Sequence, residues 1–159
     1  MGSLNTVLCG IPIDNPIIPA SGTFGYGYEF AELYDINCLG SFSFKGTTAS
    51  PREGNPLPRI AESASGMLNS VGLQNPGVES VICDELPKLR RVFRKQVIAN
   101  ICGFSISEYV EVAEKLDQQD QVGWLEVTGV LVAEIRRKLG SNAVGLYIAL
   151  EEGASLGFL

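Results

Sequence analysis

Short apolar runs alternate along the chain with stretches whose apolar residues recur every three or four positions. The apolar runs predict buried strands at 17–20, 38–44, 97–101 and 124–127. The stretches between them have the periodicity of amphipathic helices, at 29–34, 78–94 and 105–116. Strands that alternate with helices in this way predict a parallel sheet with helical crossovers, and therefore an α/β fold.

Local signals refine the helices and the segments between them. Pro87 predicts a kink in the 78–94 helix, whose apolar stripe consists of Val81, Ile82, Leu86, Leu89 and Phe93. Ser105 or Ser107 can cap the following helix. The prolines and glycines of 46–58 predict a polar loop, and the Gly and Asn signals of 59–77 predict an excursion with a small hairpin.

Composition narrows the class of protein. With 159 residues, of which 45% are hydrophobic and 19% charged, the chain suits one globular domain. A net charge of −6 gives no electrostatic footprint for nucleic acid, and the basic clusters 88–95 and 136–138 have the spacing of solvated helix faces. No apolar run approaches the roughly 18 residues of a membrane span, and the first residues do not resemble a signal peptide. We therefore expect a cytosolic protein.

The sequence contains no histidine, which excludes serine and cysteine hydrolases with a histidine base and HExxH metalloproteases. Its four cysteines form no CxxC pair, so no metal site is expected. Wide spacing in a chain with few cysteines predicts buried free thiols, at Cys9, Cys38, Cys83 and Cys102.

Two α/β architectures compete. A doubly wound nucleotide-binding domain needs a GxGxxG turn after its first strand, and the turn at 22–27, GTFGYG, has the wrong spacing. A (β/α)₈ barrel instead places its working residues at the carboxyl ends of its strands. The polar residues at those ends are Ser21, Lys45, Asn100 and, in the long loop, Asn69 and Asn75. This set suits a planar, anionic ligand rich in hydrogen-bonding groups.

Individual members of the set have alternative interpretations. Lys45 closes a strand with apolar Phe42 and Phe44, so it should face an anion, but a lysine at a strand edge can also extend its ammonium into solvent. Asn69 and Asn75 can bind a ligand or simply form turns. The spacing leaves both questions open.

Four segments carry a family resemblance: 15–25 (NPIIPASGTFG), 44–48 (FKGTT), 51–56 (PREGNP) and 66–77 (GMLNSVGLQNPG). They resemble class 1 dihydroorotate dehydrogenases, and most closely the catalytic subunit of the NAD-linked 1B type. The resemblance covers about residues 4 to 127. It implies a (β/α)₈ barrel of the TIM type, of which residues 1–127 form the N-terminal half.

The resemblance also implies an activity, which is FMN-dependent oxidation of dihydroorotate to orotate in pyrimidine biosynthesis. Residues that match the family's FMN contacts are Ser21, Lys45, Gly46 and Asn100. Residues that match its substrate contacts are Lys45, Asn69, Ser70, Val71, Gly72 and Leu73. A 1B-like protein would have a partner subunit that carries FAD and a 2Fe–2S cluster and passes electrons to NAD⁺.

After Val127 the sequence departs from the family pattern, which continues as Asn-x-Ser-Cys-Pro-Asn with the cysteine as catalytic base. Thr128 stands where the first asparagine belongs, and no cysteine follows it. Cys102 does not match the motif and is interpreted as a small buried thiol. No catalytic residue is therefore assigned.

The divergent tail, 128–159, predicts a helix at 130–140 and a strand at 143–150. A half-barrel would leave strand edges unpaired, so we expect an oligomer and an inactive isolated chain. Two other functions stay open: a non-enzymatic half-barrel that serves as an interaction module, and a flavoprotein like dihydropyrimidine dehydrogenase. The motif at 66–77 favours the orotate enzyme.

Overall fold

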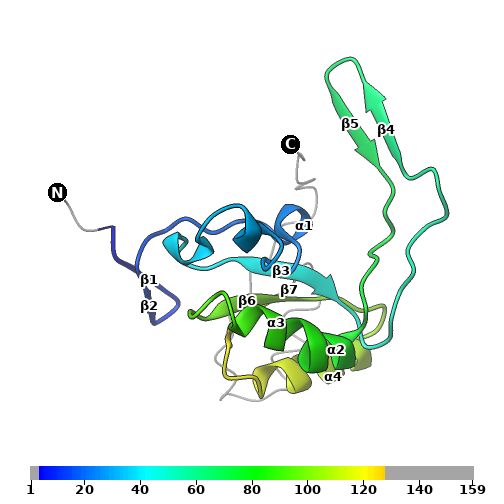
Figure 1. The fold of residues 1–159 in the computed structure, drawn as a ribbon. Helices are drawn as coiled ribbons and strands as arrows, with labels where there is room; N and C mark the ends of the chain where they lie inside the picture. Colours follow the sequence, from blue (N-terminus) through cyan, green and yellow to red (C-terminus); the bar gives the residue numbers. More distant parts are fainter. Residues whose placement is uncertain (1–3, 128–159) are drawn as a thin grey trace.

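The computed structural model of the protein describes residues 4–127 (Figure 1). The helix and strand expected in 128–159 lie outside the described residues. The centre of the fold is a parallel sheet with the strand order β3–β6–β7, formed by β3 (Ser43–Thr47), β6 (Val97–Ile101) and β7 (Val122–Val127). The predicted α/β class is confirmed. The sheet is open within residues 4–127, so they do not form a closed barrel.

Helical crossovers connect the three strands. The first is a continuous run of α2 (Val78–Ser80), a π-helical turn η3 (Val81–Glu85) and α3 (Leu86–Arg90), and the second is α4 (Ile106–Asp117). All of them lie on one side of the sheet, below the strands in Figure 1. No helix in the described part of the chain combines the length and apolarity needed to cross a bilayer.

Side chains alternate between the two faces of the sheet. The apolar residues of β6 and β7 that point toward the helices join one large core cluster, as Val97, Ala99, Ile101, Leu125 and Val127. The opposite face begins apolar, because Ile98 and Trp124 pack with Ile13. Nearer the carboxyl ends it becomes polar, since Asn100 and Glu126 occupy the next positions in register.

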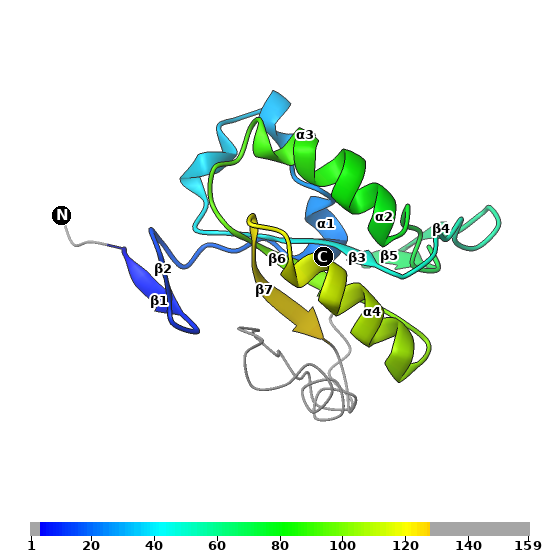
Figure 2. The same ribbon diagram turned by 90° about the horizontal axis from the view of Figure 1, so that it is seen from below.

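A small N-terminal hairpin covers the apolar part of this second face. It consists of β1 (Thr6–Leu8) and β2 (Ile11–Ile13), which pair antiparallel. The indole N–H of Trp124 donates to the carbonyl of Leu8 at 3.1 Å, and Trp124 is only 1% exposed. Figure 2 shows this hairpin at the end of the sheet remote from β4 and β5.

The segment 17–20 does not form the regular strand that was predicted, although it lies in the predicted place beside the sheet. The segment lies beside β3, where the backbone N–H of Gly40 donates to Ile17 (3.1 Å) and that of Ser43 donates to Pro19 (3.0 Å). Proline has no N–H to return, so Pro19 interrupts a regular ladder. From 17–20 through β3, β6 and β7, neighbouring segments therefore follow chain order without the reversal of a doubly wound sheet.

Two other predictions in the N-terminal third are wrong. The second strand begins at Ser43 rather than at 38, because η2 (Ile36–Cys38) occupies the earlier part. The helix expected at 29–34 is reduced to a 3₁₀ turn, η1 (Phe30–Glu32), which follows the single turn of α1 (Ser21–Phe24). Phe30 stacks on Phe24 with ring centres 4.5 Å apart, but Leu33 is 78% exposed and adds no packing to extend the helix.

The C-terminal predictions are confirmed more closely. β6 has the predicted bounds, and Ser105 caps α4 by accepting the backbone N–H of Glu108 at 3.3 Å. β7 begins two residues before the predicted strand. The disturbance predicted at Pro87 takes the form of the π turn that precedes it, because proline cannot donate the helical hydrogen bond at that position.

The hairpin predicted within 59–77 is also confirmed. It is formed by β4 (Ile60–Ser63) and β5 (Gly66–Asn69), which pair antiparallel, and every residue of both strands is exposed. In Figure 1 it projects away from the sheet as an arm. We call residues 55–73 the arm, since they form the hairpin and the two stretches that connect it to the body.

Gly40 tests how the 17–20 segment is seated on β3. A Cβ at this position would lie 1.8 Å from the backbone oxygen of Asn15, so Gly40→Ala must displace the main chain. We expect a loss of about 2–3 kcal/mol in the free energy of unfolding, as for overpacked sites. Urea unfolding followed by Trp124 fluorescence measures it. Gly66→Ala is the control, since its Cβ would meet only Ser63 Oγ at 4.0 Å, and equal losses in both variants would contradict the expectation.

Candidate functional site

Hydrogen bonds at the carboxyl end of β6 join two distant parts of the chain. The Asn100 side-chain N–H donates to Ser21 Oγ at 3.1 Å, which links β6 to the start of α1. The Cys102 thiol donates to Asn100 Oδ1 at 3.3 Å. Asn100 is thereby held at both ends of its amide. Two of the predicted cofactor-binding residues, Ser21 and Asn100, are in direct contact.

Gly46 packs closely against the same group. A Cβ on Gly46 would lie 3.0 Å from Cys102 Sγ, 3.1 Å from Leu73 Cδ1 and 3.3 Å from Asn100 Oδ1. A larger residue would have to push these side chains apart. We call the five residues that meet here the strand-end cluster: Ser21, Gly46, Leu73, Asn100 and Cys102.

Lys45 precedes Gly46 in β3 and is half-buried. Among residues 4–127 its ammonium forms no hydrogen bond or ion pair. Its charge nevertheless reaches the cluster, because it lowers the pKa of the Cys102 thiol. A half-buried cation without a fixed counter-ion supports the interpretation that Lys45 faces an anion.

A second charged group lies on the same face. Glu126 in β7 accepts a hydrogen bond from the Ser43 hydroxyl of β3, across the intervening β6. Its charge also acts on Cys102, in the direction opposite to Lys45. Sequence reasoning did not select Glu126, although the alternation of Trp124 to Val127 could have placed it on the face away from the helices.

Burial, followed by the nearby Glu126 carboxylate, raises the pKa of the Cys102 thiol, Lys45 opposes both, and the net result is a pKa of about 11. Cys102 is therefore a neutral thiol at neutral pH, and a neutral thiol is a poor base and nucleophile. This agrees with the interpretation of Cys102 as a structural residue.

Apart from Lys45, the predicted substrate-binding residues lie in the arm, at 69–73, and divide into two groups. In the first, Asn69 to Val71, the Ser70 N–H donates to the carbonyl of Arg59 (2.8 Å) and the Val71 carbonyl accepts from the N–H of Asn55 (3.0 Å). Gly72 and Leu73 then turn the chain with positive φ angles of 78° and 57°. This turn brings Leu73, alone of residues 69–73, into the strand-end cluster.

Asn75 has the structural role that the sequence left open for it. Its Oδ1 accepts the backbone N–H groups of Thr48 (3.1 Å) and Gly77 (3.0 Å), and its side-chain N–H donates to the carbonyl of Leu73 (2.9 Å). Asn75 is 5% exposed. It fixes the returning end of the arm to the end of β3.

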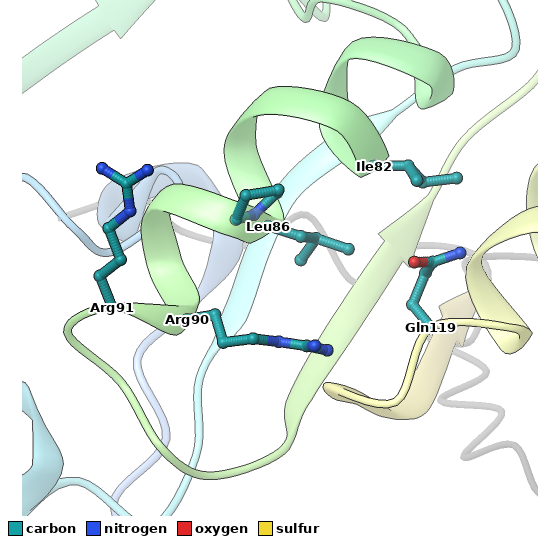
Figure 3. Close-up of a pocket in the computed structure, with 6 residues that line it drawn as sticks. Ile82, Leu86, Arg90, Arg91 and Gln119 are labelled. Atoms are coloured by element: carbon teal, nitrogen blue, oxygen red, sulfur yellow. The ribbon is translucent and has the colours of Figure 1, made fainter.

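One surface hollow of the described residues lies elsewhere. It has a volume of about 320 Å³ and is lined by Ile82, Leu86, Pro87, Arg90, Arg91 and Gln119. Figure 3 shows Arg90 directed toward Gln119 and Arg91 directed away from it. The hollow lies beside α3 on the helical side, and none of the predicted site residues lines it.

The cysteines match the prediction in part. All four are free thiols, but Cys9, Cys38 and Cys83 are exposed rather than buried, and only Cys102 is half-buried. The prediction of burial rested on the usual tendency of small apolar side chains to be buried in the core. In the residues that the structure describes, no group of three or more acidic, cysteine or histidine side chains could hold a metal ion.

Comparisons with known proteins agree with the resemblance found in the sequence. A family model described as dihydroorotate dehydrogenase matches residues 3–130. Over 124 residues the chain is 53% identical to the dihydroorotate dehydrogenase B (NAD(+)) catalytic subunit of Bacillus pumilus, covering 78% of this chain and 40% of that protein.

Two further catalytic subunits of the same name are similar. That of Bacillus cytotoxicus is 50% identical over 127 residues, with 80% of this chain and 41% of the relative covered. That of Streptococcus pneumoniae is 49% identical over 125 residues, with 78% and 40% covered. The chain thus spans about two fifths of the length of these curated relatives.

The two asparagines of the long loop should respond differently to substitution. Asn75→Ala leaves the backbone N–H groups of Thr48 and Gly77 without their acceptor, at a cost of about 2–4 kcal/mol in the free energy of unfolding. Asn69→Ala, on the exposed arm, should change it by less than about 0.5 kcal/mol. Urea unfolding of both variants provides the comparison, and similar losses would contradict the assigned roles.

The pKa of Cys102 should follow the two charges beside it. Removing the negative charge with Glu126→Gln lowers this pKa, and removing the positive charge with Lys45→Met raises it. At fixed pH, each unit changes the thiolate population about tenfold. The rate of Cys102 alkylation against pH, followed by mass spectrometry, measures the shift. Glu53→Gln, an exposed carboxyl without a resolved effect on Cys102, is the control.

The same shift links stability to pH. The pKa of Cys102 is about 11 in the folded protein, above the ordinary 9.0 of the free thiol. Its stabilising contribution is thus fully present below pH 9 and is lost as the pH rises to about 11. A Cys102→Ser variant should lose this part of the alkaline dependence, and an unchanged curve would contradict the assignment.

Proposed function

The chain belongs to the dihydroorotate dehydrogenase family, and we propose that its site corresponds to that of an enzyme for the FMN-dependent oxidation of dihydroorotate to orotate in pyrimidine biosynthesis, with the isolated chain inactive on its own. The observation that carries the proposal is the strand-end cluster. Its residues come from four separate segments and meet at the carboxyl ends of adjacent parallel strands. Beside them lies the Lys45 ammonium, which has no counter-ion among residues 4–127.

A (β/α)₈ barrel is the architecture we propose for the complete enzyme. Neighbouring segments follow chain order from 17–20 to β7, and their crossovers share one face. In such barrels the helices form the outer ring, and the opposite face of the sheet lines the interior. Residues 1–127 would contribute the first half of the wall.

The donor set fits a flavin. Ser21 and Asn100 offer a hydroxyl and an amide, Gly46 leaves no side chain in the way, and Lys45 offers a positive charge. When bound, FMN supplies the acceptor for a hydride equivalent from the substrate. Lys45 would compensate the negative charge that reduction places on the ring system, and it would do so without moving.

The substrate would be held by the arm. Asn69 to Leu73 provide a side-chain amide, a hydroxyl and several backbone groups, which suit a ligand with carboxylate and imide edges. A site of this kind discriminates strongly, because an analogue that lacks a partner leaves a polar group unpaired. Leu73 would connect the arm to the flavin side of the site through its contact with Gly46.

The name of the relatives, catalytic subunit of a NAD(+)-linked enzyme, supports a partner subunit for electron transfer. In the proposed assembly that subunit carries FAD and a 2Fe–2S cluster, and the catalytic subunits are oligomeric. A cytosolic location belongs to the same proposal. It is supported by the four free thiols, which persist in reducing compartments.

Flavin titration tests the proposal directly. The flavin phosphate in barrels of this type is held by loops after strands seven and eight, which lie beyond the first half of the wall. We therefore expect the chain to quench riboflavin and FMN fluorescence with affinities equal within about twofold. Asn100→Ala should weaken both about tenfold, as expected for loss of a buried hydrogen bond.

Asn69→Ala is the matched control, because it removes an amide from the arm rather than from the strand-end cluster. Absence of quenching by riboflavin would contradict the site, and much tighter binding of FMN would contradict the expectation that residues outside the first half of the wall hold the phosphate. Incubation of the flavin-loaded chain with dihydroorotate should yield no orotate, because Thr128 replaces the family asparagine and no base cysteine follows. Turnover would contradict this expectation.

A further inference from the structure

An exposed aromatic ring lies beside the candidate site and makes one specific contact. Phe104, in the loop between β6 and α4, is 69% exposed. The guanidinium of Arg52, from the loop after β3, lies 4.6 Å from the centre of its ring. Two loops that follow neighbouring strands are joined by this stack.

The position of Phe104 is well fixed despite its exposure. Its backbone N–H donates to the carboxylate of Glu108 at 2.6 Å, and the next residue, Ser105, caps α4. A ring held in place but not buried is available as a platform for a cation. Arg52 uses that platform.

Arg52 has little else to hold its side chain. Its Nε is buried and has no hydrogen-bond partner, and no hydrogen bond of its guanidinium is formed among residues 4–127. Its backbone, in contrast, is paired with Asn75 in both directions, with N–O distances of 2.8 and 3.1 Å. The stack on Phe104 therefore determines where the Arg52 side chain lies.

The connection continues from Arg52 to the strand-end cluster. Asn75 donates to the carbonyl of Leu73 at 2.9 Å, and Leu73 lies against Gly46. Cys102, which borders Gly46 as well, is two residues before Phe104. The contacts form a closed ring from the loop after β6, through the loop after β3 and the end of the arm, back to the cluster.

We propose that Phe104 is a positioning residue of the strand-end cluster, which acts by stacking on Arg52 and thereby holding Leu73 against Gly46. What the cluster binds rests on the proposed function. The stack itself can be measured without flavin or substrate, so the positioning role of Phe104 and the proposed function can be refuted independently.

The predicted consequence is greater access to Cys102 when the stack is lost. A cation–π contact at an exposed site shifts an equilibrium by about two- to fivefold. Without the ring, the segment from Arg52 to Leu73 should open more often, and Cys102 should become reactive in the open state. The effect should be confined to this one thiol.

The experiment compares the full chain with Phe104→Leu and Phe104→Trp. Phe104→Leu keeps an apolar side chain but removes the π face, and Phe104→Trp keeps the face. Alkylation by iodoacetamide is quantified for each cysteine by mass spectrometry. Cys9, Cys38 and Cys83 are exposed and serve as internal controls in the same sample.

We expect Cys102 in Phe104→Leu to react about two- to fivefold faster than in the unmodified chain. Phe104→Trp should react at the original rate or more slowly, and the three control cysteines should be unchanged. An unchanged Cys102 rate in Phe104→Leu would overturn the proposal. Equal acceleration at all four cysteines would also overturn it, because it would show general loosening of the fold.

Discussion

A parallel sheet must have both of its faces covered, and this requirement organises the protein. Helices α2 to α4 cover one face with a continuous apolar core. On the other face, only the part around Trp124 is apolar, and the N-terminal hairpin covers it. The remaining part carries Lys45, Asn100 and Glu126 near the strand ends. The polar part of the face that no described helix covers is where the candidate site lies.

Elements that depend on local interactions could be predicted from the sequence, whereas elements that depend on contacts far along the chain could not. β6 and α4 were predicted closely, because an apolar run and a serine cap act within a few residues. The segments 17–20 and 29–34 were mispredicted, because their conformation depends on a missing proline N–H and on packing partners far along the chain. The arm was predicted as a hairpin, but its projection from the body depends on tertiary contacts that no local pattern reports.

The site residues also divide into those whose position could be predicted from the sequence and those whose position could not. Parallel strands bring their carboxyl ends together, so the meeting of Ser21 and Asn100 followed from the strand assignments. The role of Asn75 did not, because Thr48, its partner, is 27 residues away.

The π turn in the first crossover has a consequence for changes in chain length. Val81 and Leu86 are both buried although they are five positions apart, a spacing that would place them on different sides of a regular α-helix. The wider turn restores their common orientation by accommodating one additional residue. Deletion of one residue within 81–85 would therefore leave an ordinary helix with its buried stripe in phase. The same deletion elsewhere in 78–90 would rotate part of the stripe by about 100°, so this turn is the position in the crossover where the length of the chain can vary.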